Sequence, residues 1–190
     1  MRDHPIKPAA QMPDEPLRVR TKSMLWLMAV VAIVALALDL LSKAWALANL
    51  EEGVAQPFLG TFIQLQLIHN PGAAFSLGAG STWIFTILSI GIICLIFWYA
   101  TRVDSTLLAV LLGLIAGGAA GNLWDRLTRP PGVGQGHVVD FINYNGWFIG
   151  NVADIWIVGA ALALILWKLF EKDSGDTKVA PSKAVGGEGE

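Results

Sequence analysis

The sequence predicts an all-α membrane protein with four transmembrane helices. Hydrophobic residues make up 54% of the 190 residues, whereas a soluble domain contains about 45–50%. Only 15% of the residues are charged, against about 25% in a soluble domain. Four apolar stretches each come close to the roughly 20 residues that a helix needs to cross the hydrocarbon core. Strands are excluded as membrane spans because open sheet edges cannot lie in lipid.

Two polar tails flank the predicted membrane domain. Residues 1–22 carry four prolines and mixed charges, and residues 171–190 are similarly polar. Neither tail can bury enough apolar surface to fold, so we expect both to be disordered. The domain between them covers residues 23–170. Its expected spans are 24–48, 82–100, 105–123 and 152–170.

The first span also has the pattern of a cleavable signal peptide. Basic residues precede its apolar core, and residues 46–48 read Ala-Leu-Ala, which resembles a cleavage site. Asp39 and Lys43 favour a membrane span instead. They lie between the core and this site, where signal peptides are normally uncharged.

The distribution of Lys and Arg predicts the orientation. Basic residues gather before the first span and after the fourth, and Arg102 stands in the short turn after the second. The connection 49–81 has none, and the connection 127–151 has only Arg129. The positive-inside rule then places both termini in the cytoplasm and both longer connections outside.

The first outer connection contains a short alternating pattern. Ile63, Leu65 and Leu67 are separated by Gln64 and Gln66, and a period of two is typical of a half-buried strand. We therefore expect a strand within residues 61–68, on a segment that lies against the bilayer surface.

The polar residues of the spans are expected at one depth, near the outer face. About 15 residues at 1.5 Å each place Asp39 roughly 22 Å beyond the start of the first span, and Lys43 follows one turn later on the same face. The ends of the other spans and both outer connections add polar residues at this level: His69, Asn70, Asn122, Asp125, Arg126, Asp140, Asn151 and Asp154. Ionisable groups in membranes usually face the protein interior or a wet cavity, although each one alone is equally consistent with an interfacial position.

Asp140 and Asp154 are the candidate catalytic pair. Two neighbouring carboxylates cannot both ionise easily, so one keeps a proton while the other can activate a water. Zinc chemistry is not supported because the three histidines lack a paired spacing, and no serine stands in a G-x-S-x-G context. We expect metal-free chemistry without a cofactor. The spacing of the two aspartates does not by itself establish contact.

Other function classes stay open from the residues alone. The net charge of −2 provides no basic surface, so we expect no nucleic-acid partner. The single cysteine, Cys94, excludes an intrachain disulfide. A carrier or channel could also use membrane carboxylates and an arginine, although the second span carries no charge. A membrane assembly partner could use the polar face for docking.

The third span carries a repeated G-x-x-x-G pattern at Gly113, Gly117 and Gly121. Such a pattern lets two helices approach closely, either within one chain or between copies. We interpret it as a feature of internal packing and expect the protein to act as a monomer.

Five sequence blocks, in this order and spacing, resemble the bacterial lipoprotein signal peptidases (signal peptidase II). They are DLLSK at 39–43, NPGAAFSL at 70–77, GGAAGNLWDR at 117–126, GHVVDF at 136–141 and NVADIWI at 151–157. Each block is short, but the five together, on a four-span protein of this length, are specific.

The resemblance implies an intramembrane aspartic peptidase of the bacterial cytoplasmic membrane, with its site near the extracytoplasmic face. Its partners would be the lipid bilayer and diacylglyceryl-modified prolipoproteins, from which it would remove the signal peptide just before the lipidated cysteine. Asp140 and Asp154 would be catalytic. The residues that would bind substrate or support the site are Asp39, Lys43, Asn70, Gly72, Asn122, Asp125, Arg126 and Asn151. The family fold adds a small extracytoplasmic β-cradle, in agreement with the alternating segment, and a surface helix.

Two positions depart from the family pattern. A phenylalanine usually precedes the asparagine of the last block, where this chain has Gly150. A proline often follows the tryptophan, where this chain has Phe148 after Trp147. We expect the aspartates to keep their roles and the pocket near Asn151 to differ in shape.

Overall fold

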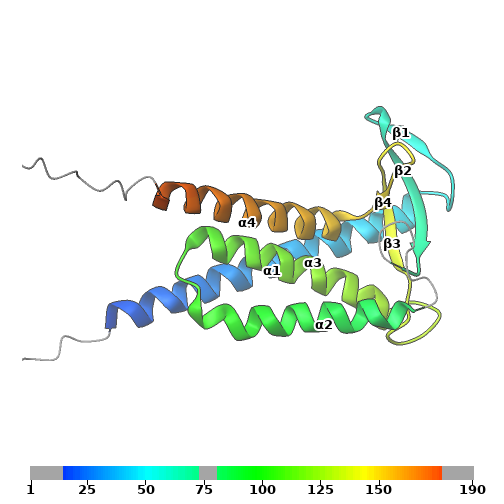
Figure 1. The fold of residues 1–190 in the computed structure, drawn as a ribbon. Coiled ribbons are helices and arrows are strands. Elements are labelled where there is room, and N and C mark those ends of the chain that lie inside the picture. Colours follow the sequence, from blue (N-terminus) through cyan, green and yellow to red (C-terminus); the bar gives the residue numbers. More distant parts are fainter. Residues whose placement is uncertain (1–14, 73–80, 177–190) are drawn as a thin grey trace, which may run out of the picture.

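Four helices of the computed structural model are long and apolar enough to cross a membrane, which confirms the predicted fold class (Figure 1). The protein is thus a multi-pass membrane protein. The structure describes residues 15–72 and 81–176, with side chains for 21–72 and 81–170. The elements in chain order are α1 (Glu15–Asn49), β1 (Gln56–Phe58), β2 (Gly60–Asn70), α2 (Thr82–Tyr99), η2 (Ala100–Arg102), α3 (Thr106–Thr128), β3 (Val138–Asn143), β4 (Ile149–Gly150) and α4 (Val152–Asp176).

The first and last helices, α1 and α4, are longer than predicted. α1 begins at Glu15, so residues 15–22 are helical rather than disordered. Pro16 is compatible with a first helical turn, and no further Gly or Pro follows up to residue 24. α4 continues to Asp176, six residues beyond the predicted end. The remaining tail residues, 1–14 and 177–190, and residues 73–77 of the NPGAAFSL block lie outside the described residues.

α3 begins one residue later and ends five residues later than predicted. Ser105 is its cap: the Oγ atom accepts a hydrogen bond from the backbone N–H of Leu108 at 3.4 Å. The helix then continues to Thr128. As a result Asp125 and Arg126 lie within the helix, with fixed directions toward its neighbours.

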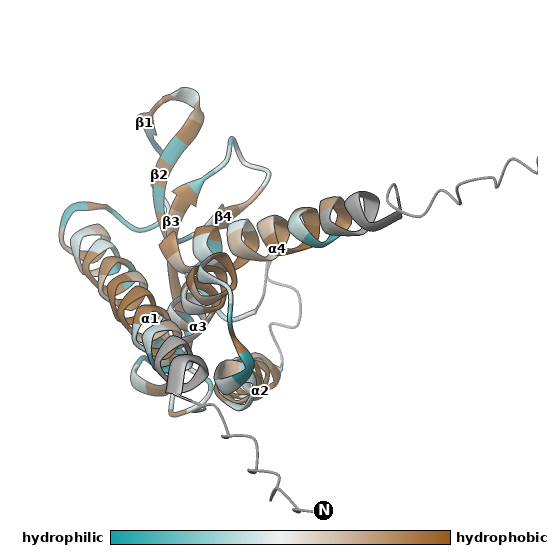
Figure 2. Cartoon of the chain, turned by 90° about the vertical axis from the view of Figure 1, so that its left-hand side faces the viewer, coloured by the Kyte–Doolittle hydropathy of each residue, from teal (hydrophilic) through white to brown (hydrophobic). Residues whose placement is uncertain are grey.

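α3 packs against the other three helices and lies between them (Figure 2). A Cβ atom built on Gly117 would lie 2.5 Å from the carbonyl oxygen of Ala32 in α1. One built on Gly118 would lie 2.7 Å from the carbonyl oxygen of Ala153 in α4. The glycines therefore let α3 contact two helices of the same chain at backbone distance.

An antiparallel sheet covers one end of the bundle, with the strand order β1-β2-β3-β4 (Figure 1). β2 includes the strand predicted at 61–68, and it pairs with β3 so that Ile68 lies opposite Asp140. Val139 of β3 is fully buried and packs in an apolar cluster with Ala46 of α1. This cluster fixes β3, and with it Asp140, to the bundle.

Candidate active site

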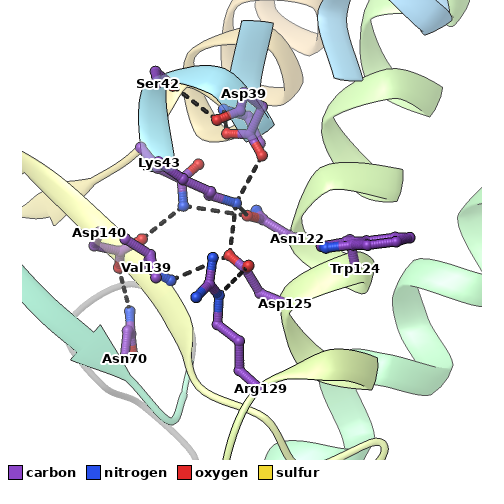
Figure 3. A network of polar contacts seen from close by, with 12 residues as sticks. Asp39, Ser42, Lys43, Asn70, Asn122, Trp124, Asp125, Arg129, Val139 and Asp140 are labelled. Atoms are coloured by element: carbon purple, nitrogen blue, oxygen red, sulfur yellow. Dashed lines mark hydrogen bonds and ion pairs between the residues drawn. The ribbon is translucent and has the colours of Figure 1, made fainter. Parts of the chain in front are cut away.

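A buried lysine connects α1 and α3 below the sheet. The Lys43 ammonium lies 2.7 Å from Oδ2 of Asp39 and 3.0 Å from Oδ2 of Asp125, and it donates to Oδ1 of Asn122 at 3.0 Å (Figure 3). An ammonium group has three donors, so each of them faces an acceptor. Lys43 and both aspartates are fully buried, and such charges are tolerated only when they are paired in this way.

The two aspartates of this cluster also hold the next two elements. Oδ1 of Asp39 accepts a hydrogen bond at 2.9 Å from the N–H of Ala153, in the first turn of α4, where a negative charge is favoured. Oδ2 of Asp125 accepts one at 3.2 Å from the N–H of Val139 in β3, and Oδ1 accepts one from Nε of Arg129 (Figure 3). The cluster therefore positions the segments that carry Asp154 and Asp140.

Asp140 is held by two side-chain amides. Its Oδ2 accepts a hydrogen bond from Nδ2 of Asn70 at 2.8 Å, and its Oδ1 accepts one from Nδ2 of Asn151 at 2.6 Å. Asp140 is 2% exposed. Neighbouring residues of a strand face opposite sides, so Asn70 points into the site while His69 pairs with Glu52 at the surface, at 2.9 Å.

Asp154 takes part in the cap of its own helix. Oδ1 of Asn151 accepts from the N–H of Asp154 at 3.1 Å, and Oδ2 of Asp154 accepts from the N–H of Asn151 at 3.0 Å. This reciprocal pair is a capping box. The other oxygen, Oδ1 of Asp154, accepts from Nδ2 of Asn122 at 3.0 Å. All four carboxylate oxygens of Asp140 and Asp154 thus accept an N–H hydrogen bond, and Asn151 contacts both residues.

The environment of Asp140 favours its protonated form. Burial, followed by the nearby charge of Asp154, raises the pKa of Asp140 from 3.8 to about 7. The amides of Asn70 and Asn151 act against this because they stabilise the ionised carboxylate. A carboxyl group with this pKa exchanges its proton near neutral pH.

Both aspartates line one cavity of about 280 Å³ between α2, α3 and α4. Arg126 enters it from α3: its Nη2 donates to the carbonyl oxygen of Gly72 at 2.7 Å, and the guanidinium lies 5.3 Å from the ring centre of Phe85. Among the residues that the structure describes, none forms a hydrogen bond with the buried Nη1 of Arg126. The cavity therefore combines two carboxylates with an available cationic donor, which suits a polar peptide or lipid group.

The structure brings together all ten residues that the sequence proposes for the site. Four of them make up the ionic cluster around the lysine: Asp39, Lys43, Asn122 and Asp125. The other six line the cavity or bond to residues that line it: Asn70, Gly72, Arg126, Asp140, Asn151 and Asp154. Their functional roles stay predictions. Among the described residues no three His, Cys, Asp or Glu side chains gather where they could hold a metal ion.

Sequence reasoning missed several residues of the site. Arg129 has no predicted role, yet it pairs with Asp125. Its position four residues later on the same helix was an available signal. Phe85 comes from a span without charged residues, so nothing in the sequence distinguishes it from lipid-facing residues. Phe148, by contrast, is one of the two departures from the family pattern noted in the sequence, and it does line the cavity.

Comparison with known proteins agrees with this geometry. Residues 31–170 match the family model for signal peptidase (SPase) II. The lipoprotein signal peptidase of Leifsonia xyli subsp. xyli is 46% identical over 143 residues, which cover 73% of this chain and 66% of that protein. The lipoprotein signal peptidase of Rhodococcus jostii is 39% identical over 176 residues, which cover 93% and 87%.

A solved structure supports the same relationship. A bacterial membrane enzyme, determined by the in meso method at 2.3 Å resolution, superimposes with a TM-score of 0.68 and 25% sequence identity. The match covers 82% of this chain and 94% of that one. With the family model extending over nearly the whole membrane domain, this chain belongs to the signal peptidase II family.

Proposed function

We propose that this protein is an intramembrane aspartic endopeptidase. It removes the signal peptide from diacylglyceryl-modified prolipoproteins and cleaves just before the lipidated cysteine. The observation that carries the proposal is the pair Asp140 and Asp154, which line one cavity and share Asn151 as a hydrogen-bond partner. Family membership supplies the substrate class.

In the proposed reaction a water molecule between the two carboxyl groups attacks the peptide carbonyl before the cysteine. Ionised Asp154 takes the proton of the water, and protonated Asp140 donates a hydrogen bond to the developing oxyanion. Asp154 then gives this proton to the cysteine nitrogen as the carbonyl–nitrogen bond breaks, which leaves a carboxyl group on the signal peptide and an amino group on the lipidated cysteine. The raised pKa of Asp140, about 7, lets this residue hold a proton near neutral pH. Positioned acid–base groups typically contribute about 10²–10⁴-fold each. The amides fix the orientation of both carboxylates before the substrate binds, so little rearrangement is needed during the reaction.

The position of the polar residues favours a peptidase over a transport pathway. Within the described residues, the buried polar and charged side chains lie in the part of the bundle near the sheet, among them Asp39, Asn70 and Asp140. A pathway would need polar groups across the full depth of the membrane. All ten site residues come from one chain, which supports action as a monomer.

We further propose the bacterial cytoplasmic membrane as the location, with both termini in the cytoplasm and the site near the extracytoplasmic face. The excess of Lys and Arg around the tails supports this orientation. The bilayer would then present both the signal helix and the diacylglyceryl group of the substrate at the depth of the cavity.

The test uses purified protein in detergent with a diacylglyceryl-modified prolipoprotein and a chelator. We expect the parent to release the signal peptide, and Asp140→Asn and Asp154→Asn each to reduce turnover at least about 100-fold. Asp104→Asn is the matched control, because Asp104 is an exposed residue of the turn before α3. Near-parental turnover by either site variant, in folded protein, would show that the pair is not catalytic.

A further inference from the structure

A groove of about 710 Å³ lies between α1 and α2. Both helices pack chiefly against α3 rather than against each other. Four of the residues that line the groove are alanines from α1, η2 and α3, so little side-chain volume fills the space: Ala29, Ala32, Ala100 and Ala116. Trp26 and Phe97 also line it, and they are 74% and 76% exposed. The groove is therefore open to the lipid side of the bundle.

The polar residues of this groove gather at one end. Of the described residues that line it, Lys22 and Thr101 are polar and all others are hydrophobic. Lys22 lies near the beginning of α1, and Thr101 lies in η2, directly after α2. Both belong to the end of the bundle that is farthest from the sheet (Figure 1). Lys22 is the only charged residue of this lining, and it forms no ion pair within the described part of the chain.

The length of the groove matches one leaflet of a bilayer. Along α1 its lining extends from Lys22 to Ile33, about three helical turns or roughly 16 Å. Half of the hydrocarbon core is about 15 Å thick. A molecule with an anionic head at Lys22 and one extended hydrocarbon chain would therefore reach from the interface to about the middle of the bilayer.

We propose that the groove binds one anionic phospholipid, with its phosphate at Lys22 and Thr101 and one acyl chain between α1 and α2. The ammonium supplies the opposite charge and the hydroxyl group an additional donor. The orientation proposed above places this end in the cytoplasmic leaflet, which contains anionic lipids. Surrounding lipid chains are as apolar as the groove, so the head group and close packing, rather than the hydrophobic effect, retain the lipid.

This site is separate from the candidate active site. The groove and the cavity of Asp140 and Asp154 have no lining residue in common, and the ionic cluster and the sheet lie toward the other end of the bundle (Figure 1). Lipid binding and peptidase activity can therefore be tested independently, and failure of either proposal leaves the other in place.

The first test counts bound lipid by native mass spectrometry of the full chain in maltoside micelles. The probes are dioleoyl phosphatidylglycerol, which is anionic, and dioleoyl phosphatidylcholine, which is zwitterionic. We expect the parent to bind the anionic lipid at least about fivefold more tightly, the typical effect of one basic residue near an anionic lipid. Lys22→Gln should remove this preference. Lys168→Gln is the matched control and should keep it, because Lys168 belongs to α4 and does not line the groove.

The second test blocks the path of the acyl chain. Ala29→Phe places a ring in the groove and should weaken binding of both lipids at least about fivefold, because two groups cannot occupy the same space. Ala37→Phe is its control, since Ala37 is an exposed residue of the same helix outside the groove, and it should bind lipid as the parent does. Circular dichroism establishes that each variant is folded.

Three results would overturn the inference. Equal binding of the two lipids by the parent would show that the groove does not recognise an anionic head group. Equal losses in Lys22→Gln and Lys168→Gln would assign the preference to general surface charge. Unchanged binding in folded Ala29→Phe, or a parent dimer that Ala29→Phe dissociates, would show that lipid binds elsewhere or that a second copy covers the groove.

Discussion

Asp140→Asn should remove a pH-dependent loss of stability. The pKa of Asp140 is raised from 3.8 to about 7 in the folded protein, so the folded state binds more protons than the unfolded state between these two values. Stability therefore falls as the pH rises through this window. The loss of stability is absent below the pKa of Asp140 in the unfolded protein, and it is complete above the pKa of Asp140 in the folded protein.

The size of the effect follows from the pKa values. Each unit of difference corresponds to about 1.4 kcal/mol, so the parent should lose about 3 kcal/mol of unfolding free energy relative to Asp140→Asn between about pH 5 and about pH 8. The variant also turns an NH2 group toward one of the amide donors of Asn70 and Asn151. That cost does not depend on pH, so it displaces the stability curve of the variant without tilting it.

The measurement is SDS-induced unfolding in maltoside micelles, followed by circular dichroism across this pH range. Asp104→Asn, which neutralises an exposed carboxylate, should follow the parent curve. The reasoning is refuted if the parent and Asp140→Asn lose stability in parallel, or if the parent gains stability relative to the variant as the pH rises.

Two further substitutions test the ionic cluster. Gly121→Ala should reduce turnover at least about tenfold and lower the stability, since its Cβ atom would lie 2.2 Å from Oδ2 of Asp39 and displace a buried partner of Lys43. Gly159→Ala in α4, where a Cβ atom would meet nothing within 4 Å, should keep full turnover and gain about 0.5–1 kcal/mol; equal effects of the two changes would contradict the steric argument. Lys43→Met should cost about 3–5 kcal/mol in the same unfolding assay, because it leaves Asp39 and Asp125 buried without their shared cation. A cost below about 1 kcal/mol would show that the cluster contributes little to stability.

The sequence predicts the four spans well because they follow from composition. The polar residues expected at one level do lie together, at the end of the bundle near the sheet. The sequence does not predict which groups pair. Asp39 bonds the backbone of Ala153, 114 residues away, and that contact depends on how α1 and α4 rotate against α3. The sequence analysis also expected His69 at the same level as Asn70. Neighbouring residues of β2 face opposite sides, so Asn70 is buried while His69 lies at the surface.

The sequence patterns also do not predict where the helices begin and end. Hydropathy marks where a segment can be in lipid, whereas a helix ends where its capping groups or backbone geometry change. Ser105 starts α3 through its hydroxyl group, and α4 continues past its last apolar residue to Asp176. The sequence also does not predict the wall of the cavity at Phe148. Only the structure shows that the Phe148 ring occupies the space beside Gly150.

The two groups of carboxylates in this site have different partners, and the difference bears on catalysis. Asp39 and Asp125 face the cations Lys43 and Arg129 and form buried ion pairs with them. Asp140 accepts its two side-chain hydrogen bonds from the neutral amides of Asn70 and Asn151. An amide orients a carboxyl group but stabilises its charge less than a cation does.

Burial can therefore keep the pKa of Asp140 near 7, the range in which a group can both give and take a proton at neutral pH. A lysine in place of Asn70 would put a cation beside Asp140, which would lower that pKa and favour the ionised form of Asp140. Asn70→Lys should thus abolish turnover even in folded protein, whereas the ionic cluster one layer below tolerates its cations because Asp39 and Asp125 are not required to exchange protons.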